Sequence, residues 1–264
     1  MFRTNPLKAK LARGEPTLGA WSTWTHAASI ELMAMAGYDA IIIDHEHGLG
    51  GLAETQSCLQ ALSAHPTAGL VRIPSADPIY IKRILDIGVE GIMVPGVEDA
   101  ETARAMVAAC RYPPHGTRGS AYGIARASNY GLAAERYRDT SAAELLIIAQ
   151  IESVAGVLAV DEIAAVDGID MLFVGPFDLS GSLGKLGRFD DREVRDTIAK
   201  AEAAIRDRDD VWFGALPSLD RSAADMVAEG VQFVANRSDG TLMRDAAVAD
   251  VGDFRTALKG MAPR

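Results

Sequence analysis

Short apolar runs alternate with longer amphipathic segments along the whole chain. The runs are rich in Val, Ile and Leu and are bounded by turn residues, which is typical of buried strands. We expect strands at Thr17–Trp21, Ala40–Ile43, Gly69–Ile73, Gly91–Val94, Leu145–Gln150, Met171–Val174, Trp212–Leu216 and Val231–Ala235. The segments between them have helical apolar spacing, and we expect helices at His26–Ala36, Leu52–Ser63, Pro78–Ile87, Ala100–Ala109, Val154–Ala165, Glu193–Arg206, Ser222–Ala228 and Thr241–Leu258.

This alternation predicts a parallel sheet, because each strand must return to the same edge through a helix. Eight strand–helix units favour closure into a (β/α)8 (TIM) barrel that forms one domain over residues 1–264. The length of 264 residues is close to the roughly 250 typical of that fold. An open, doubly wound sheet is the alternative. It has little support, because Gly48, Gly50 and Gly51 follow the second expected strand and lack the spacing of a dinucleotide-binding loop.

One long connection, Tyr112–Leu132, interrupts the alternation. It is rich in Gly, Pro, Arg and Tyr and not in the Ser or charged residues of a linker. We therefore expect an active-site loop there, and no domain boundary.

Composition narrows the classes of function. The formal net charge is −10 and no Lys/Arg run follows a helix face, which argues against a nucleic-acid partner. No apolar stretch reaches the roughly 18 residues of a membrane span, and no apolar region follows the basic N-terminus, so we expect a soluble, cytoplasmic protein. Cys58 and Cys110 lie in helical patterns, where they are expected as buried thiols and not as disulfide or zinc ligands.

Polar residues follow several of the expected strands at the end where barrel enzymes carry their chemistry. Glu152 and Asp178 follow neighbouring strands, and two carboxylates facing one pocket repel unless they share a proton or hold a cation. Such a pair leaves positions for water and substrate on Mg2+ or Mn2+. The alternative is that Glu152 interacts with a helix dipole and Asp178 caps the turn Leu179–Leu183.

Histidines and acids alternate directly after the second expected strand. Strand geometry would place His45 and His47 on one side and Asp44 and Glu46 on the other, unless the turn breaks that rule. Acid–base roles for the histidines are favoured, and a zinc site is the alternative.

Arg72 could stabilise an enolate oxygen, or form an interior ion pair with Asp44, and the two roles are compatible. No lysine ends an expected strand, where a Schiff-base nucleophile would be needed. The nearest, Lys185, is expected as a solvated loop charge.

Several stretches resemble the HpcH/HpaI aldolases in order and spacing along nearly the whole chain. They are AGYDAIIIDHEHGLGGL, LVRIPSADP, RYPPHGTRGSAYGIARAS, IAQIES and VGPFDLSGSLG. The resemblance implies a barrel of the phosphoenolpyruvate/pyruvate type and class II chemistry, with a divalent metal (Mg2+ or Mn2+, with Co2+, Ni2+ or Zn2+ as alternatives). It also implies a homo-oligomer, trimer or hexamer, in which the last helix packs on or is exchanged with a neighbouring subunit.

The same resemblance assigns roles by motif. Glu152 and Asp178 match the metal ligands, His47 the catalytic histidine, Asp44 its associated acid and Arg72 the arginine on the keto oxygen. The residues matching substrate or metal-water contacts are Gln150, Trp21 and the backbone of Gly175, Pro176 and Phe177. His45, Phe177 and Tyr122 depart from the common pattern, and we expect them to affect the aldehyde half of the substrate, Tyr122 by enlarging the loop.

The mechanism that fits is reversible cleavage of a 4-hydroxy-2-oxo acid to pyruvate and an aldehyde through a metal-bound pyruvate enolate. An acyl-CoA lyase for malyl or citramalyl thioesters is one alternative, although no basic groove for a nucleotide is evident. A barrel that binds keto acids without catalysis is the other.

Overall fold

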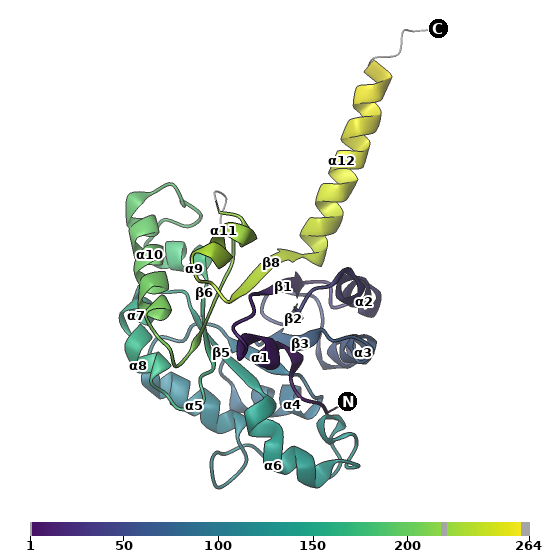
Figure 1. Ribbon diagram of the computed structural model, residues 1–264, viewed down its shortest axis with the longest axis vertical. Coiled ribbons are helices and arrows are strands. Elements are labelled where there is room, and N and C mark those ends of the chain that lie inside the picture. Colours follow the sequence, from purple (N-terminus) through teal and green to yellow (C-terminus); the bar gives the residue numbers. More distant parts are fainter. Residues whose placement is uncertain (1, 218–220, 260–264) are drawn as a thin grey trace.

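The computed structural model describes residues 2–217 and 221–259. At its centre is a closed barrel of parallel strands in the order β1-β2-β3-β4-β5-β6-β7-β8, surrounded by helices (Figure 1). The strands are β1 (Thr17–Ser22), β2 (Ala40–Asp44), β3 (Ala68–Arg72), β4 (Gly91–Val94), β5 (Leu146–Ile151), β6 (Met171–Val174), β7 (Trp212–Ala215) and β8 (Phe233–Ser238). The predicted (β/α)8 barrel is confirmed.

The helices follow the strands in the expected alternation. They are α1 (Pro6–Leu11), α2 (Ala27–Ala36), α3 (Leu52–Leu62), α4 (Pro78–Asp86), α5 (Ala100–Cys110), the 3-10 turn η1 (Arg126–Ser128), α6 (Ala134–Glu144), α7 (Val154–Leu158), α8 (Val160–Ala164), α9 (Pro176–Ser182), α10 (Arg192–Arg206), α11 (Ala223–Ala228) and α12 (Asp239–Lys259).

Several elements differ from the sequence prediction, and α1 and α9 are helices that it did not include. The expected helix Val154–Ala165 is two short helices that meet at Ala159. Helix α6 was not expected, because only Tyr137 and Ser141 of its residues are buried and its apolar pattern is correspondingly weak. The last strand starts later than Val231 and continues through polar residues to Ser238, which places Arg237 on the barrel.

Alternation along the strands separates two apolar cores. On β2, Ile42 points into the barrel while Ile41 and Ile43 pack against the helices, as expected when successive side chains face opposite sides. Leu7 and Leu11 of α1 are buried with the interior group. Helix α1 therefore packs on the barrel interior.

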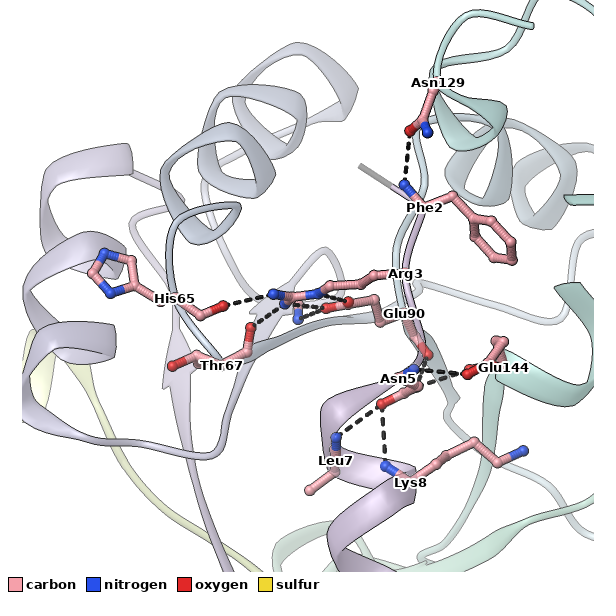
Figure 2. Close-up of polar contacts among 11 residues, drawn as sticks. Phe2, Arg3, Asn5, Leu7, Lys8, His65, Thr67, Glu90, Asn129 and Glu144 are labelled. Carbon is pink, nitrogen blue, oxygen red and sulfur yellow. Dashed lines mark hydrogen bonds and ion pairs between the residues drawn. The ribbon is translucent and has the colours of Figure 1, made fainter. Parts of the chain in front are cut away.

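Hydrogen bonds fix the N-terminal segment to loops around it (Figure 2). The Arg3 guanidinium forms an ion pair with Glu90 at 2.6 Å and donates to the carbonyl oxygens of His65 and Thr67. Asn5 caps α1 by accepting from the Leu7 and Lys8 amides. Since Glu90 immediately precedes β4, these contacts hold the segment at the N-terminal ends of the strands.

The long connection Tyr112–Leu132 lies at that same end. Arg126 Nη1 donates to the Ile87 carbonyl oxygen at 2.6 Å, and Gly88 packs against Ala127, both at the turn that leads into β4. The prediction of an active-site loop is therefore wrong within a single chain, because the connection lies at the opposite end of the barrel from the expected site residues. The connection instead packs Tyr112 and Tyr122 with Tyr137 of α6.

Helix α12 projects away from the barrel after its first turns (Figure 1). Asp239 holds its start, since the carboxylate accepts from the Ser22 hydroxyl at 2.8 Å and from the Thr23 amide at 3.0 Å. Among the described residues, no helix combines the length and apolarity needed to cross a membrane.

Candidate active site

A cavity of about 740 Å³ lies at the C-terminal ends of the strands. Its lining contains most of the residues singled out from the sequence. They are Trp21, Asp44, His47, Arg72, Gln150, Gly175, Phe177 and Asp178. The topology brings them together because parallel strands all end at the same rim of the barrel.

Asp44 and Arg72 form the fixed centre of one wall. They are opposite each other in the register of β2 and β3, and both oxygens of Asp44 accept from the guanidinium, at 2.9 Å from Nε and 2.7 Å from Nη2. The two side chains are 2% and 12% exposed, so this is a nearly buried bidentate pair. Burial alone would disfavour the Asp44 carboxylate, but the hydrogen bonds and charge of Arg72 outweigh it and lower its pKa.

The same pair keeps Arg72 charged. Burial alone would lower the pKa of Arg72, but the hydrogen bonds of Asp44 and the charges of Asp44, Glu46 and Glu152 raise it. A preorganised, permanently charged guanidinium therefore faces the cavity, with its charged end 4.6 Å from the centre of the Trp21 ring. The interior ion pair predicted as the alternative role of Arg72 is confirmed, and it is compatible with the catalytic one.

The turn after Asp44 breaks the strand alternation. Asp44 Oδ1 accepts from the Glu46 amide at 3.1 Å and, more weakly, from the His47 amide at 3.4 Å. Asp44 thus contacts His47 only through the backbone, whereas Glu46 Oε1 is 3.9 Å from the His47 imidazole. Glu46 also lies 3.1 Å from Arg72, and burial raises its pKa.

His45 points away from the cavity and into the helix layer. Its Nε2 is 2.6 Å from Thr55 Oγ1, and its Nδ1 is 2.8 Å from the Tyr80 hydroxyl. Because Thr55 Oγ1 donates its proton to the Gly51 carbonyl oxygen, it must accept from His45, which leaves Nδ1 to accept from Tyr80. Burial lowers the pKa of His45, in keeping with this neutral tautomer. Because His45 points into the helix layer and His47 lines the cavity, the two histidines do not share a side.

Glu152 lies beside the cavity lining and has the most strongly raised pKa among the carboxyls at this end of the barrel. It accepts from the Gly96 amide at 2.6 Å, and Gln150 Nε2 contacts its other oxygen. Burial raises the pKa of Glu152 to about 7, with repulsion from Glu46 and Asp178 adding to the effect and the Gly96 hydrogen bond opposing it. The carboxylates of Glu46, Glu152 and Asp178 therefore lie close enough to repel one another, and a bound cation would reduce that repulsion.

Neither predicted metal ligand caps a helix, although Glu152 lies at the N-terminus of α7, where the alternative of a dipole interaction applies. Ser153, not Glu152, caps α7, and Asp178 lies in the first turn of α9, which begins after Gly175 without a side-chain cap. A Cβ atom at Gly175 would lie 2.9 Å from Glu152 Oε2 and from Gln150 Nε2, so glycine preserves the space beside this carboxylate. Gln150 Oε1 is buried without a hydrogen-bond partner among the described residues.

These features fit a divalent cation that has few protein ligands. Within residues 2–217 and 221–259, no group of three or more His, Cys, Asp or Glu side chains is placed to hold a metal. Two carboxylates beside an orphan amide oxygen would leave positions for water and a chelating substrate, as Mg2+ and Mn2+ require.

Other predicted residues take varied places. Phe177 is 56% exposed at the rim and packs edge-on against Phe189, and Pro176 is buried as the first residue of α9. Tyr122 is not among the residues that line the cavity of its own chain. Lys185 is ion-paired with Asp191 and Glu193 away from this cavity, as expected of a loop charge.

The sequence prediction missed one wall of the cavity, formed by the end of β8 and the start of α12. It contains Asn236, Arg237, Ser238, Thr241, Arg244 and Asp245. The signal was present in the polar run NRSDGT, but that run was assigned to the connection after a strand ending at Ala235.

A parallel barrel with charged and titratable groups at the carboxyl ends of its strands is the architecture of a TIM-barrel enzyme. The chain matches the family model of the HpcH/HpaI aldolase/citrate lyase family over residues 17–246. The chain therefore belongs to this family.

Two relatives and one solved structure are similar to this chain along nearly its whole length. The chain is similar to a hydroxypyruvate/pyruvate aldolase of Delftia acidovorans, at 39% identity over 95% of this chain and 93% of the relative. A second relative of that name, from Chromohalobacter salexigens, is 39% identical over 95% of this chain and 98% of the relative. The crystal structure of an HpcH/HpaI aldolase/citrate lyase family protein from Burkholderia cenocepacia covers 96% of this chain and 100% of its own, with a TM-score of 0.90 and 34% identity.

Proposed function

We propose that this protein is a metal-dependent aldolase that reversibly joins pyruvate, or hydroxypyruvate, to an aldehyde. The observation that carries the proposal is one cavity lined by a charged Arg72, His47, Gln150 and Asp178. The carboxylate of Glu152 lies directly beside that lining, in contact with Gln150 and repelled by Asp178. Family membership and the names of the relatives support the same reaction class.

Glu152 and Asp178 are the proposed ligands of a divalent cation, Mg2+ or Mn2+. When bound, the cation would supply Lewis-acid activation of a 2-oxo acid. Gln150 orients Glu152, and the backbone at Gly175 to Phe177 is the proposed contact for the substrate carboxylate, since Gly175 leaves that side open.

Arg72 is placed to stabilise negative charge on the 2-oxo oxygen. Asp44 holds the positively charged guanidinium of Arg72 in position before substrate arrives, so the side chain does not have to reorient when the enolate forms. The Trp21 ring on which Arg72 lies excludes water from that side.

His47 is the proposed proton carrier. In the cleavage direction it takes the proton of the C4 hydroxyl, directly or through a water, while the C3–C4 bond breaks and the aldehyde leaves. Carbon C3 of the remaining enolate then takes up a proton, which gives pyruvate. Its side chain is 65% exposed at the mouth, where it can exchange that proton with solvent, and Glu46 lies beside the ring.

Cleavage can be tested by coupling pyruvate release to lactate dehydrogenase, with 4-hydroxy-2-oxoheptanedioate and 2-keto-3-deoxy sugar acids as substrates. We expect release to stop with EDTA, to return with Mn2+ or Mg2+, and to be lost in Glu152→Ala. Glu31→Ala, which alters an exposed carboxylate on α2, is the matched control and should behave as wild type. Activity that survives EDTA and Glu152→Ala would contradict the proposal.

An acyl-CoA lyase is the second candidate from the sequence. No observation in the cavity favours it over the aldolase.

A further inference from the structure

The wall formed by β8 and α12 has an unusual charge arrangement. Arg237 and Arg244 both contact one carboxylate, Asp245: Arg237 through Nη2, and Arg244 through Nε at 2.7 Å. Arg237 Nη2 also reaches the Thr241 carbonyl oxygen at 3.4 Å, while its Nε is shielded and has no partner among the described residues. Among the residues of this wall that line the cavity, one positive charge is therefore in excess, since Asp239 is not in the lining and accepts from Ser22 and Thr23.

This wall stands apart from Arg72 and Glu152, two of the groups proposed to bind the keto acid or its metal. In the closed strand order, β8 is three strands from both β3 and β5, which carry Arg72 and Glu152 at their ends. The two sides nevertheless line the same cavity of about 740 Å³. That volume lies within the roughly 300–1,000 Å³ of small-molecule sites and leaves room for a second reactant beside a three-carbon acid.

The cavity is also polarised. Asp178 lines one side, with the carboxylates of Glu46 and Glu152 close behind it, whereas Arg237 and Arg244 line the side formed by β8 and α12. In the proposed reaction the keto acid would occupy the first side, which leaves the remaining space for the substituent of the aldehyde. A guanidinium offers paired donors that match a carboxylate or a phosphate.

We infer that Arg237, assisted by Arg244, selects aldehyde acceptors that carry an anionic group. The inference rests on the proposed aldolase function. The reaction itself is unchanged: pyruvate C3 loses a proton, forms a bond to the aldehyde carbon, and the former aldehyde oxygen takes up a proton. Arg237 contacts the far end of the acceptor and not the reacting atoms.

Two matched pairs of acceptors test the inference with pyruvate as the donor. Succinic semialdehyde is compared with its neutral methyl ester, and glyceraldehyde 3-phosphate with glyceraldehyde. We expect wild type to have the higher kcat/KM for at least one anionic member. The pair with the larger ratio distinguishes a carboxylate from a phosphate.

Arg237→Gln should reduce the anionic-to-neutral ratio of kcat/KM by about 10- to 100-fold, the loss expected for a charge-assisted hydrogen bond. Arg237→Lys should restore part of it. Arg244→Gln should have a smaller effect, because that side chain is 65% exposed. Arg192→Gln removes an exposed positive charge on α10 and controls for net charge.

Asp245→Asn separates recognition from a structural role. If Arg237 only anchors α12, breaking the ion pair from either side should have the same effect on the ratio. Anion recognition predicts opposite signs, because Asp245→Asn removes the competing carboxylate and raises the ratio. Circular dichroism and thermal melting verify that each variant is folded.

Wild-type preference for the neutral acceptors, or an unchanged ratio in both Arg237→Gln and Arg244→Gln, would overturn the inference while leaving the aldolase function intact. A wild-type protein that forms no product with any acceptor, and does not exchange the methyl protons of pyruvate with solvent, would remove the proposed function and this inference with it.

Discussion

Arg72→Lys tests whether the catalytic cation depends on its geometry and not only on its charge. The guanidinium makes a bidentate contact with Asp44, at 2.9 and 2.7 Å, and approaches Glu46 at 3.1 Å. A lysine ammonium preserves the charge but cannot form the paired contact. It would also leave part of the Asp44 hydrogen bonding unmade in a nearly buried site.

The expected losses can be estimated separately. A donor that stabilises a developing oxyanion contributes about 100- to 1,000-fold to turnover, so we expect kcat to fall by that order. Replacing the bidentate contact should cost about 1–3 kcal/mol in the free energy of unfolding, since Asp44 is only 2% exposed. The Mn2+ concentration for half-activation should change less than about threefold, because the proposed ligands Glu152 and Asp178 are untouched.

The assay is coupled pyruvate release across a Mn2+ titration, together with urea unfolding of the same preparations. Arg192→Lys, at an exposed position on α10, is the matched control. A folded Arg72→Lys variant with kcat close to wild type would refute the role given to Arg72. A selective loss of Mn2+ activation with kcat preserved at saturation would assign Arg72 to metal binding instead.

Three further predictions concern other parts of the molecule. His45→Leu should lower the free energy of unfolding by about 1–3 kcal/mol, because it removes the acceptor for the Tyr80 hydroxyl and the donor to Thr55 Oγ1. The kcat/KM ratios among aldehydes should stay near wild type, and altered selectivity would contradict the placement of His45. The pKa of Asp44 is lowered from its ordinary 3.8, so the stabilising effect of its carboxylate is complete above about pH 4 and is lost as the pH falls through the folded-state pKa. The difference in the free energy of unfolding between wild type and Asp44→Asn, about 3 kcal/mol near neutrality, should therefore shrink in acid, and a constant difference would contradict this assignment. We propose that α12 packs on a neighbouring subunit in a trimer or hexamer, since its apolar side chains Val251 and Phe254 are 47% and 65% exposed. Phe254→Asp should reduce the molecular mass measured by light scattering, and an unchanged mass would contradict that role.

The barrel was predictable because its signal is repeated in every unit. Most strands are buried on both faces, so they appear as short apolar runs such as AIII in β2, and most of the helices that cover the barrel have an apolar stripe. Helix α6 escaped detection because its weak apolar pattern reflects few buried positions. The end of β8 escaped because its polar residues face a cavity instead of a core.

The candidate site was predictable at the level of which strand ends meet, but not of where side chains point. Arg72 and Asp44 pair through strand register, which the sequence pattern already implied. The turn after Asp44 could not be resolved from alternation, so the sequence left open whether His45 shares a side with His47. In the structure His45 contacts Thr55 and Tyr80 in the helix layer. Tyr122 was assigned by motif, and its position at the other end of the barrel depends on packing far along the chain.

The most direct test of the central claim is proton exchange at the methyl group of pyruvate, followed by NMR in D2O without any aldehyde. The account predicts that wild type incorporates deuterium at C3, that EDTA stops the exchange, and that Mn2+ or Mg2+ restores it. It also predicts no exchange in Glu152→Ala and much slower exchange in Arg72→Lys. Exchange that is indifferent to EDTA and to both substitutions, or its absence in folded, metal-supplemented wild type, would contradict the claim that this cavity forms a pyruvate enolate with the help of a divalent cation.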